Sequence, residues 1–206
     1  MAGRVYLDKL EHILDDFFQV LRVTFRFDKL DGCISAPLER LVFERGDSAA
    51  VLLYDAARDE VILVQQMRLP VYLREGDGWL LELVAGMIEP GRTPEEVVRS
   101  EALEEAGYRL ETVQPIATVY LSPGACTERI HIYLASISAA QRVQAGGGLP
   151  ESGEDIRVRS LPRAEAWRMV ADGHIRDAKT VLALQYLMME RRVRQGTGEK
   201  PDTLPL

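Results

Sequence analysis

The sequence is poor in the residues that build disulfide frameworks and soft metal sites. It has 206 residues but only two cysteines, Cys33 and Cys126, without a CxxC pair. Two separate thiols make neither a disulfide framework nor a zinc site. The three histidines, His12, His131 and His174, are scattered, and their spacing does not indicate a metal site. The simplest expectation is a reduced, cytoplasmic protein.

The sequence also lacks a long apolar run and an excess of basic residues. Asp and Glu occur throughout the first twenty residues, which argues against a signal peptide or a membrane span. The formal net charge of -7 argues against nonspecific binding to nucleic acid or to an anionic membrane. No Walker loop, Rossmann glycine fingerprint or Ser-His-Asp signature is present. The length suits one full core with a small extra subdomain.

The most informative stretch is residues 86–108, GMIEPGRTPEEVVRSEALEEAGY. Two glycines and a proline within its first six residues predict a tight loop of fixed backbone. Thr93, followed by Pro94 and Glu96, predicts a helix start with a capping box. Gly107 can end that helix as a left-handed C-cap. A fixed loop is therefore expected to lead directly into a capped helix.

Three glutamates of this helix share one face, because Glu101, Glu104 and Glu105 stand at positions i, i+3 and i+4. Like charges at this spacing destabilise a helix, and an external cation would relieve them. Clustered carboxylate oxygens suit Mg2+ or Mn2+. The alternative is a solvated acidic face, since charge runs usually face water. The adjacent fixed loop favours the metal interpretation, because chemistry on a phosphate with a metal needs both parts.

Together these residues resemble the Nudix box. Its pattern is Gly, five residues, Glu, seven residues, then Arg-Glu-apolar-x-Glu-Glu-x-Gly-apolar. The positions that match are Gly86, Glu101, Ala102, Glu104, Glu105, Gly107 and, more loosely, Tyr108.

Two positions depart from this pattern, since the first Glu is Arg92 and the Arg before Glu101 is Ser100. In the family these two residues tend to brace the loop against the helix and the catalytic Glu. Losing both suggests either that the brace has been replaced or that catalysis is weakened. Arg92 could compensate by pairing with a carboxylate such as Glu96 or Glu89.

The rest of the chain is predicted to be rich in strands. Residues 1–46 contain strands at 21–27 and 38–43, a sheet too small to stand alone, while residues 8–18 are compatible with helix or strand. Later strands are expected at 49–54, 60–65, 79–85, 113–121, 128–137 and 156–161, and helices at 163–171 and 177–194. Residues 141–153 are expected to form a loose loop, and residues 196–206 a flexible tail.

Four charged residues outside the box need an interpretation. Arg68 follows a strand end, where it could reach a phosphate or a base, or form an ordinary ion pair. Glu82 lies in an apolar strand and needs a partner, either a ligand group or a buried Arg. Glu151 and Glu154, in or beside the loose loop, are either solvated or candidates for a general base or for a metal ligand that arrives on closure.

Almost the whole chain resembles the nucleoside-diphosphate-sugar branch of the Nudix family, which includes ADP-ribose and GDP-mannose pyrophosphatases. A β-rich segment precedes the box, Pro123 lies fifteen residues after Tyr108, and residues 154–158 follow an acidic loop. Residues 84–89 are closer to the ADP-ribose members. Residues 145–148 and 175–180 are closer to the GDP-mannose members, so the two substrates stay open as alternatives.

The resemblance implies an α/β fold, a Nudix α/β/α sandwich around a mixed β-sheet with a β-rich N-terminal subdomain. It implies a homodimer formed through residues 1–46, a hydrolase domain at 47–195 and a tail at 196–206. The implied activity is Mg2+-dependent hydrolysis, with Mn2+ as a substitute, of a nucleotide sugar to a nucleoside monophosphate and a sugar phosphate. The alternative is a weakened Nudix protein that binds a nucleotide sugar as a sensor.

The resemblance also implies roles for single residues. The implied metal ligands are Glu101, Glu105, the Ala85 carbonyl, Glu104 and Glu154. The implied catalytic residues are Glu105, Glu154 and Glu151, because the position usually given to the base matches Ser152. Substrate contacts are assigned to Arg45, Arg68, Glu82, Gly86, Met87, Pro123, Gly124 and Glu128.

Overall fold

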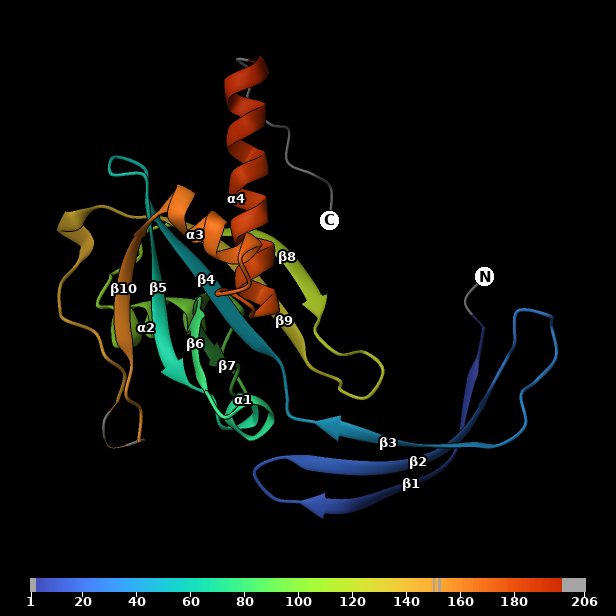
Figure 1. Ribbon diagram of the computed structural model, residues 1–206. Coiled ribbons are helices and arrows are strands. Elements are labelled where there is room, and N and C mark those ends of the chain that lie inside the picture. Colours follow the sequence, from blue (N-terminus) through green and yellow to red (C-terminus); the bar gives the residue numbers. More distant parts are fainter. Residues whose placement is uncertain (1–2, 150, 152, 198–206) are drawn as a thin grey trace. The chain divides into compact units, whose positions relative to one another are not determined.

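The computed structural model describes residues 3–149, 151 and 153–197. The chain divides into two compact units. The first consists of Met1–Asp47 with Val119–Arg129, and the second of Ser48–Thr118 with Ile130–Leu206 (Figure 1). Across the described residues, no helix is both long and apolar enough to cross a membrane.

The first unit is built on an antiparallel sheet with the strand order β1-β2-β3. These strands are Val5–Asp15, Gln19–Phe27 and Leu38–Glu44. The two strands predicted from alternation are confirmed as β2 and β3. The segment that was compatible with helix or strand is extended, since most of it belongs to β1. Its pairing with β2 supplies the backbone hydrogen bonds that an isolated strand would lack.

The second unit contains a mixed seven-stranded sheet whose main path is β10-β5-β4-β9-β8. Its strands on this path are β4 (Ser48–Asp55), β5 (Glu60–Met67), β8 (Gln114–Tyr120), β9 (Arg129–Ser136) and β10 (Arg157–Pro162). β4 pairs with β9 in parallel, whereas β5 pairs with β4 and β10 antiparallel. The predicted mixed α/β fold is therefore confirmed.

β4 and β5 pair only beside their connecting turn and then separate, and two short strands fill the gap. β6 (Trp79–Glu82) pairs with the end of β5, and β7 (Val84–Met87) pairs with the start of β4. The single strand predicted for 79–85 is therefore wrong. The strand is interrupted at Leu83, whose N–H donates to the hydroxyl of Thr180 at 2.9 Å instead of to a neighbouring strand.

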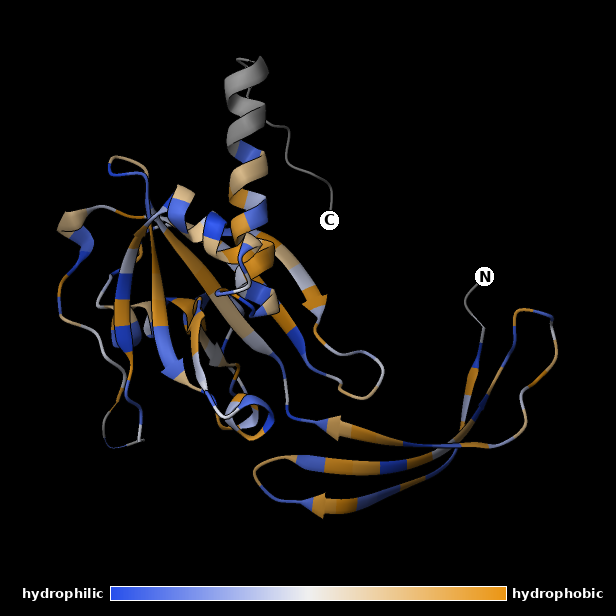
Figure 2. Cartoon of the chain, viewed as in Figure 1, coloured by the Kyte–Doolittle hydropathy of each residue, from blue (hydrophilic) through white to orange (hydrophobic). Residues whose placement is uncertain are grey.

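Helices cover both faces of this sheet. α2 (Pro94–Ala106) packs on one face, and α3 (Arg163–Ala171) and α4 (Ala178–Thr197) lie on the other (Figure 1). Alternate residues of β4 pack in one core cluster with α2; this cluster includes Ala49, Val51, Leu53, Val97, Val98 and Ala102. Every residue of β4 is buried because both of its faces are covered, and β4 is mainly hydrophobic in Figure 2.

Two short elements were not predicted: α1 (Leu69–Glu75) and a 3-10 turn, η1 (Ala139–Gln141). Pro70 lies in the first turn of α1, where its missing N–H has no partner to lose. Gly76 then ends α1 with a φ of 78°. Residues 198–206, which form most of the predicted tail, lie outside the described residues.

Candidate functional site

The local signals that predicted α2 are confirmed. Thr93 is the N-cap, and its hydroxyl accepts a hydrogen bond from the N–H of Glu96 at 3.3 Å. The carboxylate of Glu96 in turn accepts from the N–H of Thr93 at 2.8 Å. Gly107 ends the helix with a φ of 80°. This capping fixes where the helix begins and therefore which of its residues face β7.

Two glutamates of α2 lie against the backbone of β7. The side chain of Glu105 is buried, and its Oε2 accepts a hydrogen bond from the N–H of Ala85 at 3.2 Å. The side chain of Glu101 crosses Gly86 so closely that an added Cβ there would overlap Glu101 Oε1 and lie 2.5 Å from its Cδ. Gly86 is therefore needed for close approach, and Met87 follows it, half-buried, in the same strand.

Burial and mutual repulsion make these two carboxyl groups difficult to ionise. Burial, followed by repulsion from Glu104 and Glu154, raises the pKa of Glu101 to about 7. Burial, followed by repulsion from Glu101, raises the pKa of Glu105 to about 8, although Ala85 N–H and Arg68 act in the opposite direction. Four glutamates thus meet in one region, and the interpretation of a fully solvated face does not hold for Glu105.

The donor set fits a hard divalent cation. No three His, Cys, Asp or Glu side chains form a ready-made metal-binding group in the part of the chain that the structure describes. Mg2+ does not need such a group, since it usually keeps several waters and takes one or two protein carboxylates together with substrate phosphates. Glu101 and Glu105 supply two carboxylates whose repulsion a cation would offset.

Residues 145–148, Ala-Gly-Gly-Gly, form a glycine loop that packs on the C-terminal end of α2. The N–H groups of Gly147 and Gly148 donate to the carbonyls of Glu105 and Glu104, at 2.8 and 3.2 Å. These carbonyls belong to the last turn of the helix, where carbonyls lack intrahelical donors. The prediction of a loose loop is therefore wrong for this part of residues 141–153.

The same loop holds Glu154, whose Oε2 accepts a hydrogen bond from the N–H of Leu149 at 2.8 Å. Glu154 is half-buried and close enough to raise the pKa of both Glu101 and Glu105. Glu151 is exposed. Ser152, the residue at the usual position of the base, lies outside the described residues.

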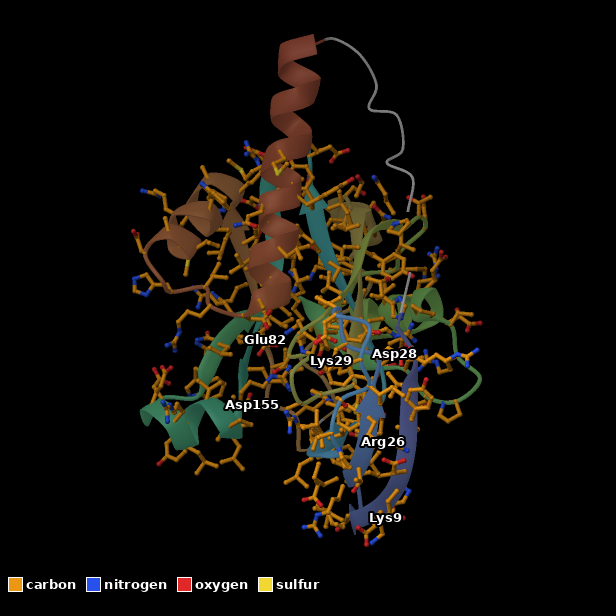
Figure 3. The ribbon with its side chains drawn as sticks, turned by 90° about the vertical axis from the view of Figure 1, so that its right-hand side faces the viewer. Lys9, Arg26, Asp28, Lys29, Glu82 and Asp155 are labelled. Carbon is orange, nitrogen blue, oxygen red and sulfur yellow. The ribbon has the colours of Figure 1, made fainter. Side chains whose placement is uncertain are left out.

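Glu82 is the centre of a buried ion cluster. Both of its oxygens accept hydrogen bonds from Arg68, at 2.8 and 3.0 Å, and Lys179 donates to Oε2 at 2.6 Å. Burial acts to raise the pKa of Glu82, but the hydrogen bond from Arg68 and the charge of Lys179 outweigh it and lower the pKa to about 2. Glu82 lies by the N-terminal end of α4 (Figure 3), and Lys179 bridges it to Asp177 at 2.9 Å.

An arginine was the plainer alternative predicted as the partner of Glu82; its identity as Arg68 and the second partner, Lys179, were not predicted. One signal could have identified it. Lys179 stands in the first turn of a helix, where a positive charge opposes the helix dipole, so it needs a carboxylate nearby. Arg68 keeps a side chain that is 40% exposed, so its pairing with Glu82 leaves part of the guanidinium open to a ligand.

Four predicted substrate contacts lie in the first unit. Arg45 Nη1 is 3.5 Å from Glu128 Oε2, and the Arg45 guanidinium carbon lies 5.5 Å from the centre of the Phe18 ring. Glu128 is buried. Pro123 and Gly124 are exposed in the turn that Ala125 N–H closes onto Ser122.

The predicted pairing of Arg92 with Glu96 or Glu89 is not a direct one among the described residues. The hydrogen bonds from Thr93 and the charge of Arg92 nevertheless lower the pKa of the Glu96 carboxyl. Its Nη2 donates to the backbone carbonyl of Glu96 at 3.1 Å and to the hydroxyl of Ser100 at 2.6 Å. The Glu96 carboxylate is turned toward the N-cap, where its Oε2 accepts from both the N–H and the hydroxyl of Thr93.

Comparison with known proteins gives consistent results. The family model described as the NUDIX domain matches residues 44–184. GDP-mannose pyrophosphatase of Escherichia coli O1:K1 / APEC is 38% identical over 190 residues, which are 92% of this chain and 97% of that protein. The protein of the same name from Shigella dysenteriae serotype 1 is 37% identical over 194 residues, 94% of this chain and 100% of the relative.

One solved structure, "Crystal structure of ADP compounds hydrolase", superposes with a TM-score of 0.69. It covers 96% of this chain and 98% of its own, at 20% sequence identity. At that identity the likeness concerns the fold alone.

The raised pKa values predict that the metal-free protein loses stability as the pH rises. Between the ordinary value of 4.5 and the folded values of about 7 and about 8, the folded state holds more protons than the unfolded state. The free energy of unfolding therefore falls with increasing pH in that window. We expect the Tm of EDTA-treated protein to fall between roughly pH 5 and pH 8, and to fall less in Glu105→Gln.

Scanning fluorimetry across this pH range measures the effect. Glu95→Gln is the matched control, because it makes the same chemical change at an exposed position of the same helix. A Glu105→Gln protein with the pH slope of the wild type would contradict the assignment of the raised pKa.

The glycine loop predicts a large effect for Gly146→Ala. Gly146 has a φ of 76°, and an added Cβ would lie 2.5 Å from the carbonyl oxygen of Glu105. Left-handed strain and backbone overlap together should lower the free energy of unfolding by about 2 to 4 kcal/mol, measured by urea denaturation. Gly153→Ala, at a φ of 75° with open space around it, should show only the strain, about 1 kcal/mol. Equal losses in the two variants would show that close packing at Gly146 is unimportant.

Proposed function

The chain belongs to the Nudix family, and we propose that it hydrolyses the pyrophosphate bond of a nucleoside diphosphate sugar to a nucleoside monophosphate and a sugar phosphate. The observation that supports this most is the pair Glu101 and Glu105, held against β7 at the glycine of the box. The relatives named GDP-mannose pyrophosphatase extend over nearly the whole chain, which favours GDP-mannose over ADP-ribose as the substrate.

Glu101 and Glu105 would hold Mg2+, or Mn2+ in its place, with the Ala85 carbonyl and Glu104 as further ligands. When bound, the cation supplies charge neutralisation at the diphosphate and a more acidic water. The raised pKa values of the two carboxyl groups fit this role, because both groups ionise more readily beside a cation. Gly86 and Met87 would present backbone groups of β7 to the substrate.

Glu154 is proposed as the loop ligand or base. Its carboxylate is fixed by Leu149 N–H near Glu101 and Glu105, whereas Glu151 is exposed and becomes the second choice. A base must reach the proton that it accepts, so a carboxylate held in place beside the metal ligands is better suited than a solvated one.

Arg68 is proposed to contact a phosphate of the substrate. Glu82 fixes two of its nitrogens, which orients the planar guanidinium while 40% of the side chain stays exposed. A guanidinium fixed in this way suits an anionic oxygen. Glu82 thus acts by positioning Arg68. Arg45, Pro123, Gly124 and Glu128 of the first unit are proposed as further substrate contacts.

A homodimer formed through residues 1–46, with residues 47–195 as the hydrolase domain, is proposed from the surface of the first unit. β1 carries exposed apolar side chains along its length: Val5, Leu7, Leu10, Ile13 and Leu14, each 44–66% exposed. The register with β2 puts Val5, Leu7 and Leu10 beside Phe27, Phe25 and Val23 on one face of the sheet, whereas Leu14 pairs with Val20 on the other face. The apolar row on the first face calls for a covering surface. A second copy of the chain provides the same apolar row in a two-fold arrangement.

Leu7→Glu should disrupt this dimer. A carboxylate in an apolar interface loses water without gaining a partner, so the variant should shift toward the mass of a single chain, 23.1 kDa, in size-exclusion chromatography with light scattering. Leu30→Glu, on the exposed turn between β2 and β3, should keep the mass of two chains. A wild-type protein with the mass of one chain at micromolar concentration would reject the dimer.

A cytoplasmic location is proposed from the two cysteines. Cys33 and Cys126 are free thiols rather than a disulfide. Free thiols are usual in a reducing compartment.

Turnover tests the proposed function directly. Wild-type protein with Mg2+ should release a sugar phosphate and a nucleoside monophosphate from GDP-mannose, read as phosphate after coupling to a phosphatase. Glu105→Gln should lower the rate about a hundredfold or more, because the neutral amide loses the charge that holds the cation. Glu95→Gln should keep the wild-type rate.

The same assay with ADP-ribose ranks the two substrates. Tight binding of either nucleotide sugar by the wild type without any product would overturn hydrolysis and favour the sensor function.

A further inference from the structure

We propose that Arg92 and Ser100 form a brace between the loop and α2 that positions Glu101 for the divalent cation, in place of the acidic and basic residues of the box pattern. The inference rests on the proposed metal-dependent hydrolysis. It assigns Arg92 and Ser100 as positioning residues, because both act through Glu101.

The brace starts from a tight turn between β7 and α2. Arg92 N–H donates to the carbonyl of Glu89 at 3.1 Å, and Pro90 and Gly91 occupy the two central positions, with a φ of 86° at Gly91. Proline followed by a glycine with positive φ is the signature of a type II turn. Arg92 is therefore fixed at the end of the loop, one residue before the N-cap Thr93.

From there the Arg92 side chain runs along the first two turns of α2. Its Nη2 donates to the Glu96 carbonyl at 3.1 Å and to Ser100 Oγ at 2.6 Å. Ser100 Oγ lies 2.9 Å from the Val97 carbonyl, to which its own proton can be donated. The hydroxyl accepts from Arg92 while it donates to the helix, which a serine can do and a second cationic residue cannot.

Ser100 directly precedes Glu101, so the brace fixes the helix next to the carboxylate that packs tightly against β7. Glu101 crosses Gly86 at a distance that excludes even a Cβ. A small rotation or slide of α2 against the loop would move that carboxylate into the backbone of β7 or away from it. The hydrogen bond from Arg92 to Ser100 links the loop to the helix one residue before Glu101 and so restricts this movement.

The brace also changes the local charge. An acidic and a basic residue at these two positions would cancel, whereas Arg92 and Ser100 together carry one positive charge. That charge acts on Glu101 against the repulsion from Glu104 and Glu154. The two departures from the box pattern are complementary because Arg92 supplies the donor and Ser100 the acceptor of one hydrogen bond, and this favours a replaced brace over an impaired site.

The decisive measurement is the affinity of the metal-free protein for Mn2+. The electron paramagnetic resonance signal of free Mn2+ reports how much of the ion stays unbound. Arg92→Ala should weaken Mn2+ affinity about tenfold, the effect typical of a residue that orients a metal ligand. Ser100→Ala should weaken it less, and the double alanine variant should be no worse than Arg92→Ala, because the two residues act as one unit. Arg92→Lys, which keeps the charge but replaces the planar guanidinium by a shorter, flexible amine, should lie between wild type and Arg92→Ala.

Arg99→Ala is the matched control. Arg99 is on the same helix and donates to the carbonyl of Leu110 at 2.7 Å, so its loss removes a cation and a hydrogen bond without touching the brace. We expect Arg99→Ala to lower the Tm while Mn2+ affinity and the Mg2+ dependence of GDP-mannose turnover stay at wild-type values.

Exchange of the pair provides a rescue. Arg92→Glu should weaken Mn2+ binding at least as much as Arg92→Ala, because its carboxylate cannot donate to the Glu96 carbonyl and is repelled by it. The double variant Arg92→Glu/Ser100→Arg restores the order of the box pattern and should recover most of the wild-type affinity. Circular dichroism verifies that each variant is folded.

The outcomes separate this inference from the proposed function. A wild type that turns over GDP-mannose, with Arg92→Ala binding Mn2+ as tightly as wild type, rejects the brace and leaves hydrolysis standing. Equal losses of affinity in Arg92→Ala and Arg99→Ala also reject it, because they indicate a general effect on the helix. A wild type without Mn2+ binding or turnover removes the proposed function and the brace together.

Discussion

The repulsion between buried carboxyl groups is the constraint on which the rest of the site depends. Glu105 is buried and Glu101 half-buried, both against β7, and Glu104 and Glu154 add to their repulsion. Such an arrangement would open if its supports were loose. It is held at the start of α2 by the turn that carries Arg92, and at its end by the N–H groups of the glycine loop. The surrounding backbone therefore maintains an unfavourable arrangement that a bound divalent cation would relieve.

Local signals predicted the parts of the fold that local interactions determine. The helix α2 follows from the capping box at Thr93 and the left-handed glycine at its end, and both features involve residues close in sequence. The break between β6 and β7 could not be predicted in the same way, because it depends on the hydroxyl of Thr180, 97 residues further along the chain. The ordered glycine loop is similar, since its glycines appear flexible in sequence and become fixed only through the carbonyls at the end of α2.

The same distinction holds within the site. Helical spacing places Glu101, Glu104 and Glu105 on one face without any knowledge of the fold. The need of Glu82 for a partner was also evident from a carboxylate in an apolar strand. The identity of that partner was only half predictable, because Arg68 is near in sequence whereas Lys179 comes from a helix that folds back over β6. Spacing therefore identified the carboxylates that we propose as metal ligands, and tertiary packing decided the cationic side of the site.

The distribution of charge explains why the carboxylates call for a cation from outside the chain. Arg68 attracts Glu105, but its charge and that of Lys179 are already matched by Glu82 and Asp177. The single charge of Arg92 acts on Glu101 as well as on Glu96, and at Glu101 it is opposed by Glu104, Glu154 and Glu89. A diphosphate bound beside this region would add more negative charge, so its binding and the ionisation of the carboxyl groups oppose each other. A divalent cation held by these glutamates would reverse the sign of that coupling, because it would attract both the phosphate oxygens and the carboxylates. Metal and substrate should for this reason bind cooperatively, each raising the affinity for the other.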